Sequence, residues 1–442
     1  MAGSDYRDGF PDPRPEDVRA AHRAAVGAQV GALSSGAQRE AFVRRVDERR
    51  LERRRGRRDL EPVEVLDDGA GRTLVRPGDL LAGATAADDE RAVRLLADEG
   101  FTVEPVAELG GRVLRCRRDG VPPARLEGLA GELRALGHLA SVDHVVPLAP
   151  VVKGLSGPEP SPVGVPRPTA SARAGAGVRV AVVDTGITPE RRADGWLDAV
   201  PREGEVDPLD DLPEPNGLLD LAAGHGTFVA GVVAQVAPGA ELRAYRAVDS
   251  DGIGSDLEIA LALVRALRDG ADVVNLSFGV QTPGDVPPVA LQAAVDILAE
   301  EHPEALVVAA AGNDGSDRPS WPAAFREVVA VGALDVDLAP APWSNRGHWV
   351  DCSAVGEGVL STYVPGVEDP EFDPAPDTYP ADAWAVWTGT SFAAPQVAGL
   401  VARVAAERGT GVQEAWRTVQ RAAVRVPGAG RVVPVLQGTT RG

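Results

Sequence analysis

The sequence predicts an α/β domain with a mostly parallel central sheet flanked by helices, preceded by a small α+β domain of order β-α-β-β-α-β. Three observations lead to this prediction. Beyond about residue 176, short apolar runs rich in Val and Ala alternate with helical stretches, as in strands buried on both faces of a parallel sheet. Residues 72–151 show shorter, mixed strand and helix patterns, and a Pro/Gly/Ser-rich stretch separates the two regions. At 442 residues the chain is too long for one ordinary core.

Residues 1–71 are predicted to form a polar, Arg-rich N-terminal arm that is partly helical. Its most unusual feature is the run RRLERRRGRR at residues 49–58. A nucleic-acid patch and a processing site are alternatives for this run. Because acidic residues are interleaved and no aromatic residue is nearby, we expect a solvated helical face or a flexible arm.

Residues 72–151 are predicted to form the small domain. Its expected elements are a strand at 73–75, a helix at 88–99, strands at 101–106 and 112–116, a helix at 124–136 and a strand at 142–148. In the second helix Leu126, Leu129, Leu133 and Leu136 recur on one face, and Gly137 follows as a stop signal. This order is that of a compact split-βαβ domain.

Residues 152–175 have the composition of an extended linker without a core of its own. The α/β domain is expected over residues 176–437, with a short tail at 438–442. Its predicted strands cover 178–183, 242–248, 273–276, 306–310 and 328–331. The helix expected after Ser391 is apolar nearly all round, as a helix through a domain centre would be, and Pro395 is expected in its first turn.

The composition of the chain argues against several kinds of partner and binding site. The formal net charge is -20, which on average repels nucleic acid and anionic membrane surfaces, so neither is expected as a partner. Cys116 and Cys352 lie far apart without a CxxC motif, so we expect buried small side chains and not a zinc site or a disulfide framework. The first residues have no apolar core of the secretory type, and no window approaches the length of a membrane span. We expect a monomeric cytoplasmic protein, and secretion by another route stays open.

Four polar residues stand in Gly-bounded motifs at the ends of apolar runs or at helix starts: Asp184 in VDTG, His225 in GHGT, Asn313 in AGND and Ser391 in GTSFAAP. Ligands of open α/β sheets bind at the carboxyl ends of the strands. A Ser hydroxyl needs an adjacent base, and that base needs a carboxylate to orient it. Asp184, His225 and Ser391 supply these roles, and Asn313 supplies a side-chain N–H for an oxyanion.

These motifs closely resemble those of the subtilisin family of serine peptidases, and the resemblance covers about residues 176–437. It implies a subtilisin-like catalytic domain and a serine endopeptidase that acts on peptides or proteins and needs no cofactor for its chemistry. It also implies that Gly252, Ile253 and Gly254 form one strand that binds the substrate backbone, and that Ser277, Phe278 and Gly279 form the opposite one. Residues near Ser320-Trp321-Pro322 are expected at the entrance to the pocket for the side chain before the scissile bond.

By the same resemblance, the domain at 72–151 looks like the family's inhibitory propeptide and folding chaperone. The chain would then be a zymogen whose own N-terminal domain is its intramolecular inhibitor. Self-cleavage is expected within about residues 150–175, where the linker would first lie in the active site.

Three departures from the family pattern have consequences. Phe228 stands where relatives often have a second His, which should alter packing and not catalysis. Between Val233 and Ala240 the chain lacks a longer loop that holds calcium in many relatives, so that structural site is expected to be absent. The segment Val364 to Ala383 is acidic and Pro-rich; we expect a solvated surface loop, and the alternatives are that it binds calcium or shapes substrate access.

Two other functions remain open from sequence alone. One is a dedicated processing peptidase for a single partner. The other is a non-enzymatic peptide-binding module on which the N-terminal domain stays docked as a plug.

Overall fold

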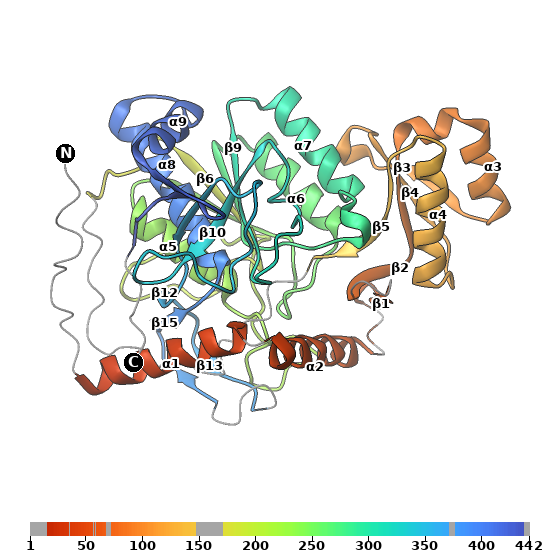
Figure 1. Ribbon diagram of the computed structural model, residues 1–442. Coiled ribbons are helices and arrows are strands. Elements are labelled where there is room, and N and C mark those ends of the chain that lie inside the picture. Colours follow the sequence, from red (N-terminus) through yellow and green to blue (C-terminus); the bar gives the residue numbers. More distant parts are fainter. Residues whose placement is uncertain are drawn as a thin grey trace.

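The computed structural model describes residues 16–34, 36–55, 57, 59–67, 72–146, 171–370 and 376–436. A large α/β unit forms its centre, and a smaller unit projects from one side of it (Figure 1). Two N-terminal helices, α1 (Glu16–Ser34) and α2 (Gly36–Arg54), lie along the lower side in that view. The linker predicted at 152–175 falls largely outside the described residues, as does the tail at 438–442.

The α/β unit is built on an eight-stranded sheet of order β16-β17-β11-β10-β9-β8-β6-β7. All neighbouring pairs are parallel except β16 with β17, which closes one edge as an antiparallel pair. The strands are β6 (Arg179–Asp184), β7 (Glu241–Arg246), β8 (Val273–Leu276), β9 (Leu306–Ala310), β10 (Val328–Leu334), β11 (Cys352–Val355), β16 (Val424–Val426) and β17 (Gly430–Val432).

Helices cover both faces of this sheet, as its apolar runs require. In β6, Val180 and Val182 belong to the core shared with α5 (His225–Val236) and α8 (Thr390–Arg408). The alternate residues Ala181 and Val183 face the core shared with α6 (Asp256–Arg268) and α7 (Val289–Glu301). A further helix, α9 (Val412–Ala422), packs against α8. The predicted fold class, a mostly parallel sheet with helices on both faces, is confirmed.

The smaller unit contains elements that correspond to the six expected from the sequence. They are β2 (Arg72–Gly83), α3 (Glu90–Asp98), β3 (Thr102–Pro105), β4 (Val113–Arg117), α4 (Pro123–Ala135) and β5 (Ala140–Val145). One side of β2 pairs with β5, and the other pairs with β4 and with an additional strand β1 (Glu64–Asp67). The sheet thus begins before residue 72, and β2 is much longer than the strand expected at 73–75. Its second half, around Gly78, carries a Gly and an Asp that obscured the strand pattern.

The smaller unit docks on α6 and α7 through its sheet. Leu81, Val106, Leu109 and Val113 join the apolar core of those helices. Side chains of β5 also cap the two helix starts: the Leu257 N–H donates to Asp143 Oδ1 (3.3 Å) and the Val289 N–H donates to Ser141 Oγ (3.1 Å). Unpaired N–H groups at a helix start favour such acceptors.

The N-terminal arm packs against the α/β unit, so the expectation of a solvated face or flexible arm was wrong. Val26, Val30 and Leu33 of α1 belong to the core that contains β15 (Trp384–Trp387), and Gln29 Nε2 donates to the Val386 carbonyl (3.2 Å). Arg50, Arg53 and Arg54 of α2 are buried. Their partners lie in acidic loops about 200 residues away in sequence, which no local charge pattern reveals.

The segment Val364 to Ala383 was also only partly predicted. Residues 371–375 lie outside the described part of the chain, but the flanking residues form the antiparallel pair β13 (Gly366–Val367) and β14 (Thr378–Tyr379). Val364, Tyr379 and Ala383 are buried, so both ends of the segment belong to the core. The preceding β12 (Val359–Thr362) pairs with β15.

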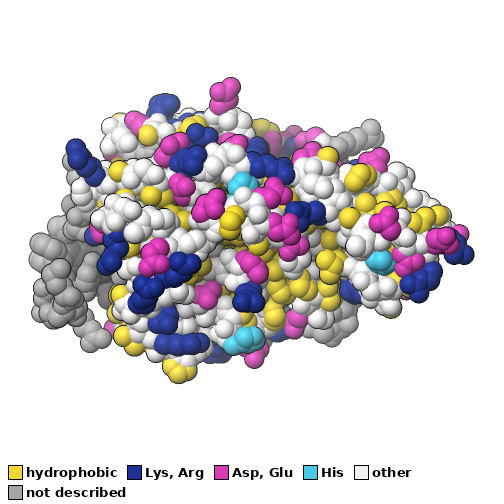
Figure 2. Space-filling view, turned by 90° about the horizontal axis from the view of Figure 1, so that it is seen from above, with side chains coloured by type: hydrophobic (Ala, Val, Ile, Leu, Met, Phe, Trp, Pro, Cys, Tyr) yellow, Lys and Arg dark blue, Asp and Glu magenta, His cyan; other side chains and the backbone are white. Residues whose placement is uncertain are grey.

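Other expectations concern single residues and the surface. Cys116 and Cys352 are free and buried, as expected, and burial raises the pKa of the Cys116 thiol to about 12. On the face seen in Figure 2, basic and acidic side chains are interspersed. In the described part of the chain, no helix is long and apolar enough to cross a bilayer.

Candidate active site

The carboxyl end of β6 and the start of α5 bring Asp184 and His225 together. Asp184 Oδ1 lies 2.7 Å from His225 Nδ1 and also accepts the N–H of Thr185 at 2.8 Å. Asp184 is fully buried and His225 is 4% exposed. A carboxylate at Nδ1 holds the proton on that nitrogen, so Nε2 is the ring nitrogen that can accept one.

A second buried carboxylate, Asp207, fixes this pair and was not anticipated from the sequence. Asp207 Oδ2 accepts from Thr185 Oγ1 and from the Gly224 N–H, both at 2.8 Å, and Thr185 Oγ1 in turn accepts the Gly226 N–H at 3.0 Å. The strand end and the helix start are therefore joined directly. A Cβ on Gly226 would lie 2.1 Å from the Gly186 carbonyl oxygen, so only Gly permits this approach.

Ser391 lies at the second position of α8, with its side chain beside β8. Its hydroxyl donates to the Ser277 carbonyl at 2.9 Å, and the Ser277 hydroxyl donates to the Ser391 carbonyl at 2.8 Å. The second bond has a clear cause. Pro395 has no N–H for the Ser391 carbonyl four residues earlier, and Ser277 Oγ, itself held by Asn275 Nδ2 at 2.8 Å, replaces it. Pro395 was expected in the first turn of this helix. Because α8 begins at Thr390, Pro395 lies beyond the first turn, and that expectation was wrong.

Asn313 follows β9 and points its amide toward the start of α8. Its Oδ1 accepts from the Thr390 N–H at 2.9 Å and the Thr390 hydroxyl at 2.8 Å. These bonds orient the amide so that Nδ2 is a buried donor without a partner in the described structure. Nδ2 lies 3.5 Å from the position of a Cβ on Gly389. A buried unpaired N–H next to a candidate nucleophile is what an oxyanion site requires.

An aromatic cluster encloses His225 on its inner side. The His225 ring packs edge-on to Trp387 at 5.2 Å and tilted to Phe392 at 5.4 Å. Phe228 is fully buried and contacts the same two rings, at 5.5 and 4.6 Å between ring centroids. In this chain Phe228 is therefore a packing residue.

The two candidate substrate segments, 252–254 and 277–279, each lie beside another segment of the chain. Gly254 already accepts a backbone hydrogen bond from Val146, just after β5, at 2.8 Å. On the other side, Val280 forms a two-way backbone bridge with Trp321, both bonds at 2.9 Å. A Cβ on Gly279 would lie 2.6 Å from Ser320 Oγ. Segments 277–279 and 320–322 are thus neighbours, while Phe278 is buried in the core.

No group of three or more His, Cys, Asp or Glu side chains is arranged to hold a metal ion within the described ranges. The chemistry available at the site is that of a hydroxyl, an imidazole, a carboxylate and an amide donor. This set suits acyl transfer to a Ser oxygen.

Comparison with known proteins places these residues in context. The model of the subtilase family matches residues 175–429. Subtilisin BL of Lederbergia lenta is 36% identical over 241 residues, which are 52% of this chain and 77% of that protein. Thermitase of Thermoactinomyces vulgaris is 30% identical over 272 residues, 58% of this chain and 84% of that protein.

Other similarities cover different shares of the chain. The thermophilic serine proteinase of Bacillus sp. (strain AK1) is 33% identical over 264 residues, and the match spans 58% of each chain. Among solved structures, fervidolysin from Fervidobacterium pennivorans, described as a keratinolytic enzyme related to subtilisin, matches 84% of this chain and 61% of its own with a TM-score of 0.56 and 19% identity. That last similarity is one of fold alone.

Proposed function

Because the chain belongs to the subtilase family of serine peptidases, we propose that it is a serine endopeptidase that hydrolyses peptide bonds through an acyl-enzyme on Ser391. The observation that carries this proposal is the arrangement at the start of α8. His225 is held by Asp184 at 2.7 Å, and the unpaired amide donor of Asn313 is fixed by Thr390 next to Ser391. A structural role for Asn313 would not require an orphaned, buried N–H.

In the proposed mechanism, substrate binding prepares the nucleophile. The Ser391 hydroxyl donates to the Ser277 carbonyl in the present structure. An incoming peptide N–H would compete for that carbonyl and so free the hydroxyl to turn toward His225 Nε2. His225 then takes the hydroxyl proton as Ser391 Oγ attacks the scissile carbonyl carbon. Asp184 stabilises the imidazolium and holds its orientation.

The negative charge that develops on the carbonyl oxygen would be stabilised by Asn313 Nδ2 and by the backbone N–H of Ser391 at the start of α8. When the tetrahedral intermediate collapses, the proton on His225 passes to the leaving amine. Water, deprotonated by His225, then hydrolyses the Ser391 ester through the same oxyanion site. No metal or cofactor is needed for these steps.

We further propose that the substrate backbone adds as a strand between residues 252–254 and 277–279. The backbone hydrogen bond from Val146 to Gly254 supports this proposal, because the Gly254 carbonyl already accepts from an added chain segment there. The pairing of Val145 with Ser255 is antiparallel. A substrate strand that continued this antiparallel pairing would pass Gly252, which is the course that we propose for a bound peptide.

The chain would accordingly be made as a precursor that cleaves itself within about residues 150–175. A fluorophosphonate probe tests the activity. We expect covalent labelling at Ser391 in the processed protein, loss of labelling in the His225→Ala variant, and hydrolysis of denatured protein substrates. A folded, processed protein that neither reacts with the probe nor cleaves any denatured substrate would overturn the proposal.

A further inference from the structure

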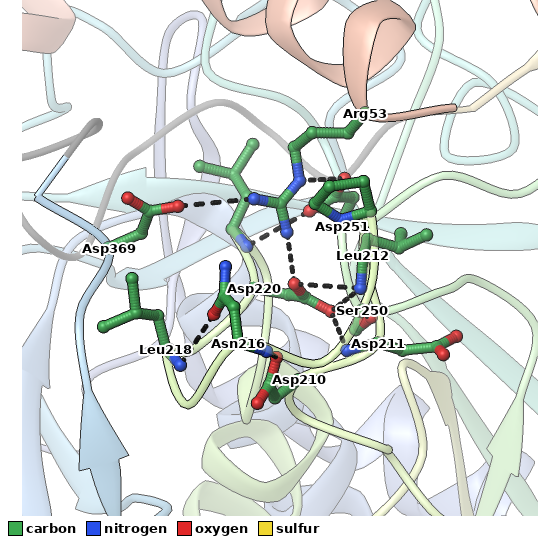
Figure 3. Close-up of polar contacts among 12 residues, drawn as sticks. Arg53, Asp210, Asp211, Leu212, Asn216, Leu218, Asp220, Ser250, Asp251 and Asp369 are labelled. Carbon is green, nitrogen blue, oxygen red and sulfur yellow. Dashed lines mark hydrogen bonds and ion pairs between the residues drawn. The ribbon is translucent and has the colours of Figure 1, made fainter. Parts of the chain in front are cut away.

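Four carboxylates beside the proposed substrate strand surround two arginines of the N-terminal arm. They are Asp220, Asp249, Asp251 and Asp369, referred to below as the acidic cluster. Asp220 lies five residues before His225, and Asp251 directly precedes Gly252. Figure 3 shows Arg53 reaching from α2 into the loops that carry Asp220, Asp251 and Asp369.

Each nitrogen of the Arg53 guanidinium donates to a different carboxylate. Nε lies 3.0 Å from Asp251, Nη1 lies 3.4 Å from Asp369, and Nη2 contacts Asp220. The Arg53 side chain is 2% exposed, and those of its three partners are 9% exposed or less. Arg54 contacts Asp249 next to it. This three-way geometry fits a planar guanidinium and not the compact ammonium of a Lys.

Loops of the α/β unit also hold two of these carboxylates, Asp220 and Asp251. Asp220 Oδ2 accepts the Asp211 N–H at 2.9 Å and the hydroxyl of Ser250, and Asp251 Oδ1 accepts the Leu221 N–H at 3.3 Å. The acidic cluster is therefore built from within the catalytic unit, and Arg53 is what fills it. The proposed self-cleavage would cut the chain between the arm and the α/β unit. After that cut, no covalent bond would hold Arg53 in the acidic cluster.

Departure of the arm would leave four acidic side chains close together without the two guanidinium groups that now neutralise them. Burial and the neighbouring charge of Asp251 already raise the pKa of Asp220 to about 6. Carboxylates held close together without a counter-charge repel one another, and an opposite charge within hydrogen-bonding distance relieves that repulsion. We therefore expect a cation to bind there again. The three carboxylates are arranged to accept from three nitrogens in one plane, which favours a guanidinium group. A cavity of about 780 Å³, lined in part by Arg54, Asp249 and Ile253, adjoins the cluster.

We propose that the acidic cluster is an arginine-binding site of the catalytic unit, filled in the precursor by Arg53 and available after processing to an arginine on the N-terminal side of a substrate's scissile bond. This inference rests on the proposed peptidase function for its substrate, because Asp251 directly precedes the proposed substrate-binding segment Gly252 to Gly254. Binding of a guanidinium group by the acidic cluster does not depend on peptidase activity. The arm thus acts as an internal competitor for basic peptides.

The site is tested first in the full-length Ser391→Ala chain, where nothing is cleaved. Arg53→Ala is compared with Arg55→Ala, an exposed arginine directly after the same helix. Loss of the buried partner should lower the melting temperature by about 5–15 °C, and loss of Arg55 by less than about 2 °C. Millimolar methylguanidinium chloride should raise the melting temperature of Arg53→Ala saturably, while tetramethylammonium chloride at the same concentration should not.

Equal melting temperatures for the two variants, or the same response to both salts, would overturn the arginine site whether or not the chain is a peptidase. If Arg53→Ala does not fold, Arg53→Lys serves instead. Lys keeps the charge but cannot donate from three nitrogens in one plane, so Arg53→Lys should melt below the parent. A melting temperature equal to the parent's would contradict the site.

Substrate selection is tested on the processed enzyme with peptides that carry Arg or Ala at each of the four positions before the scissile bond. One position should favour Arg by about 10- to 100-fold in kcat/KM, the size expected of a charge-assisted hydrogen bond. Asp251→Asn should reduce that ratio toward one. An active enzyme without an Arg preference at any position would refute the substrate assignment and leave the peptidase function standing; absence of probe labelling would refute the function instead.

Discussion

The docking of the N-terminal unit should weaken as pH rises, and replacing Asp143 by Asn should remove much of that dependence. Asp143 is a fully buried residue of β5 that faces Asp256 at the start of α6. Burial first, and then the charge of Asp256, raise the pKa of Asp143 well above its ordinary value of 3.8. Burial likewise raises the pKa of Asp256 to about 7.

The sign follows from proton linkage. Between the ordinary and the raised pKa, the docked unit holds one more proton at Asp143 than the open form does, so docking free energy falls by about 1.4 kcal/mol per pH unit. The raised pKa of Asp256 likewise weakens docking as pH rises, up to about pH 7. The neighbouring His144, whose pKa burial lowers to about 4, acts in the opposite direction below about pH 6.5.

The Asp143→Asn variant keeps Asp256 and His144. The difference in docking free energy between this variant and the parent therefore reports the Asp143 carboxyl alone. The Asn oxygen can still accept the Leu257 N–H. Amide hydrogen exchange of β5 in the Ser391→Ala chain, corrected for intrinsic rates, reports the opening free energy at each pH. The two proteins should be similar near pH 4, and the variant should be better protected at pH 7. Asp119→Asn, an exposed carboxyl of the same unit, is the control. Parallel profiles for the parent and Asp143→Asn would refute the reasoning.

Three further substitutions test the catalytic site. Asn313→Ala should lower kcat by about 100- to 1000-fold with a smaller change in KM, a magnitude known for subtilisin, a relative within the family; an unchanged kcat would remove Asn313 from the oxyanion site. Asp184→Asn should lower kcat by about 10⁴-fold because the imidazole loses the acceptor that fixes its tautomer, and activity within 10-fold of the parent would contradict this role. Gly226→Ala places a methyl 2.1 Å from the Gly186 carbonyl oxygen and should cost about 1–3 kcal/mol in the free energy of unfolding. Gly128→Ala, in the exposed face of α4, should be neutral or stabilise by about 0.5–1 kcal/mol, and similar denaturation midpoints for these two Ala variants would argue against the close approach.

Much of the fold could be predicted from sequence because its parallel strands are continuous apolar runs. Two of these runs end at or shortly before Asp184 and Asn313, so both residues could be singled out as candidates by position alone. His225 and Ser391 stand in Gly-bounded helix starts, which are also local signals. These features need no knowledge of distant partners.

What escaped prediction depends on contacts between distant segments. Asp207 has no motif of its own; its role appears only when Thr185 and Gly224 are brought to it. Arg53 lies 198 residues from Asp251, so its charge looked solvated when only its neighbours in sequence were considered. The replacement of a helix bond by Ser277 Oγ likewise depends on β8 lying beside α8.

The most direct test of the account is the intact mass of the purified full-length chain and of its Ser391→Ala variant, prepared in parallel. The account predicts that the unsubstituted chain is cut within about residues 150–175 and that the variant keeps its full mass. A variant cut at the same bond would assign the cleavage to another protease. A full-mass parent chain that also fails to react with a fluorophosphonate after prolonged incubation would contradict the claim that Ser391 is the nucleophile of a self-processing peptidase.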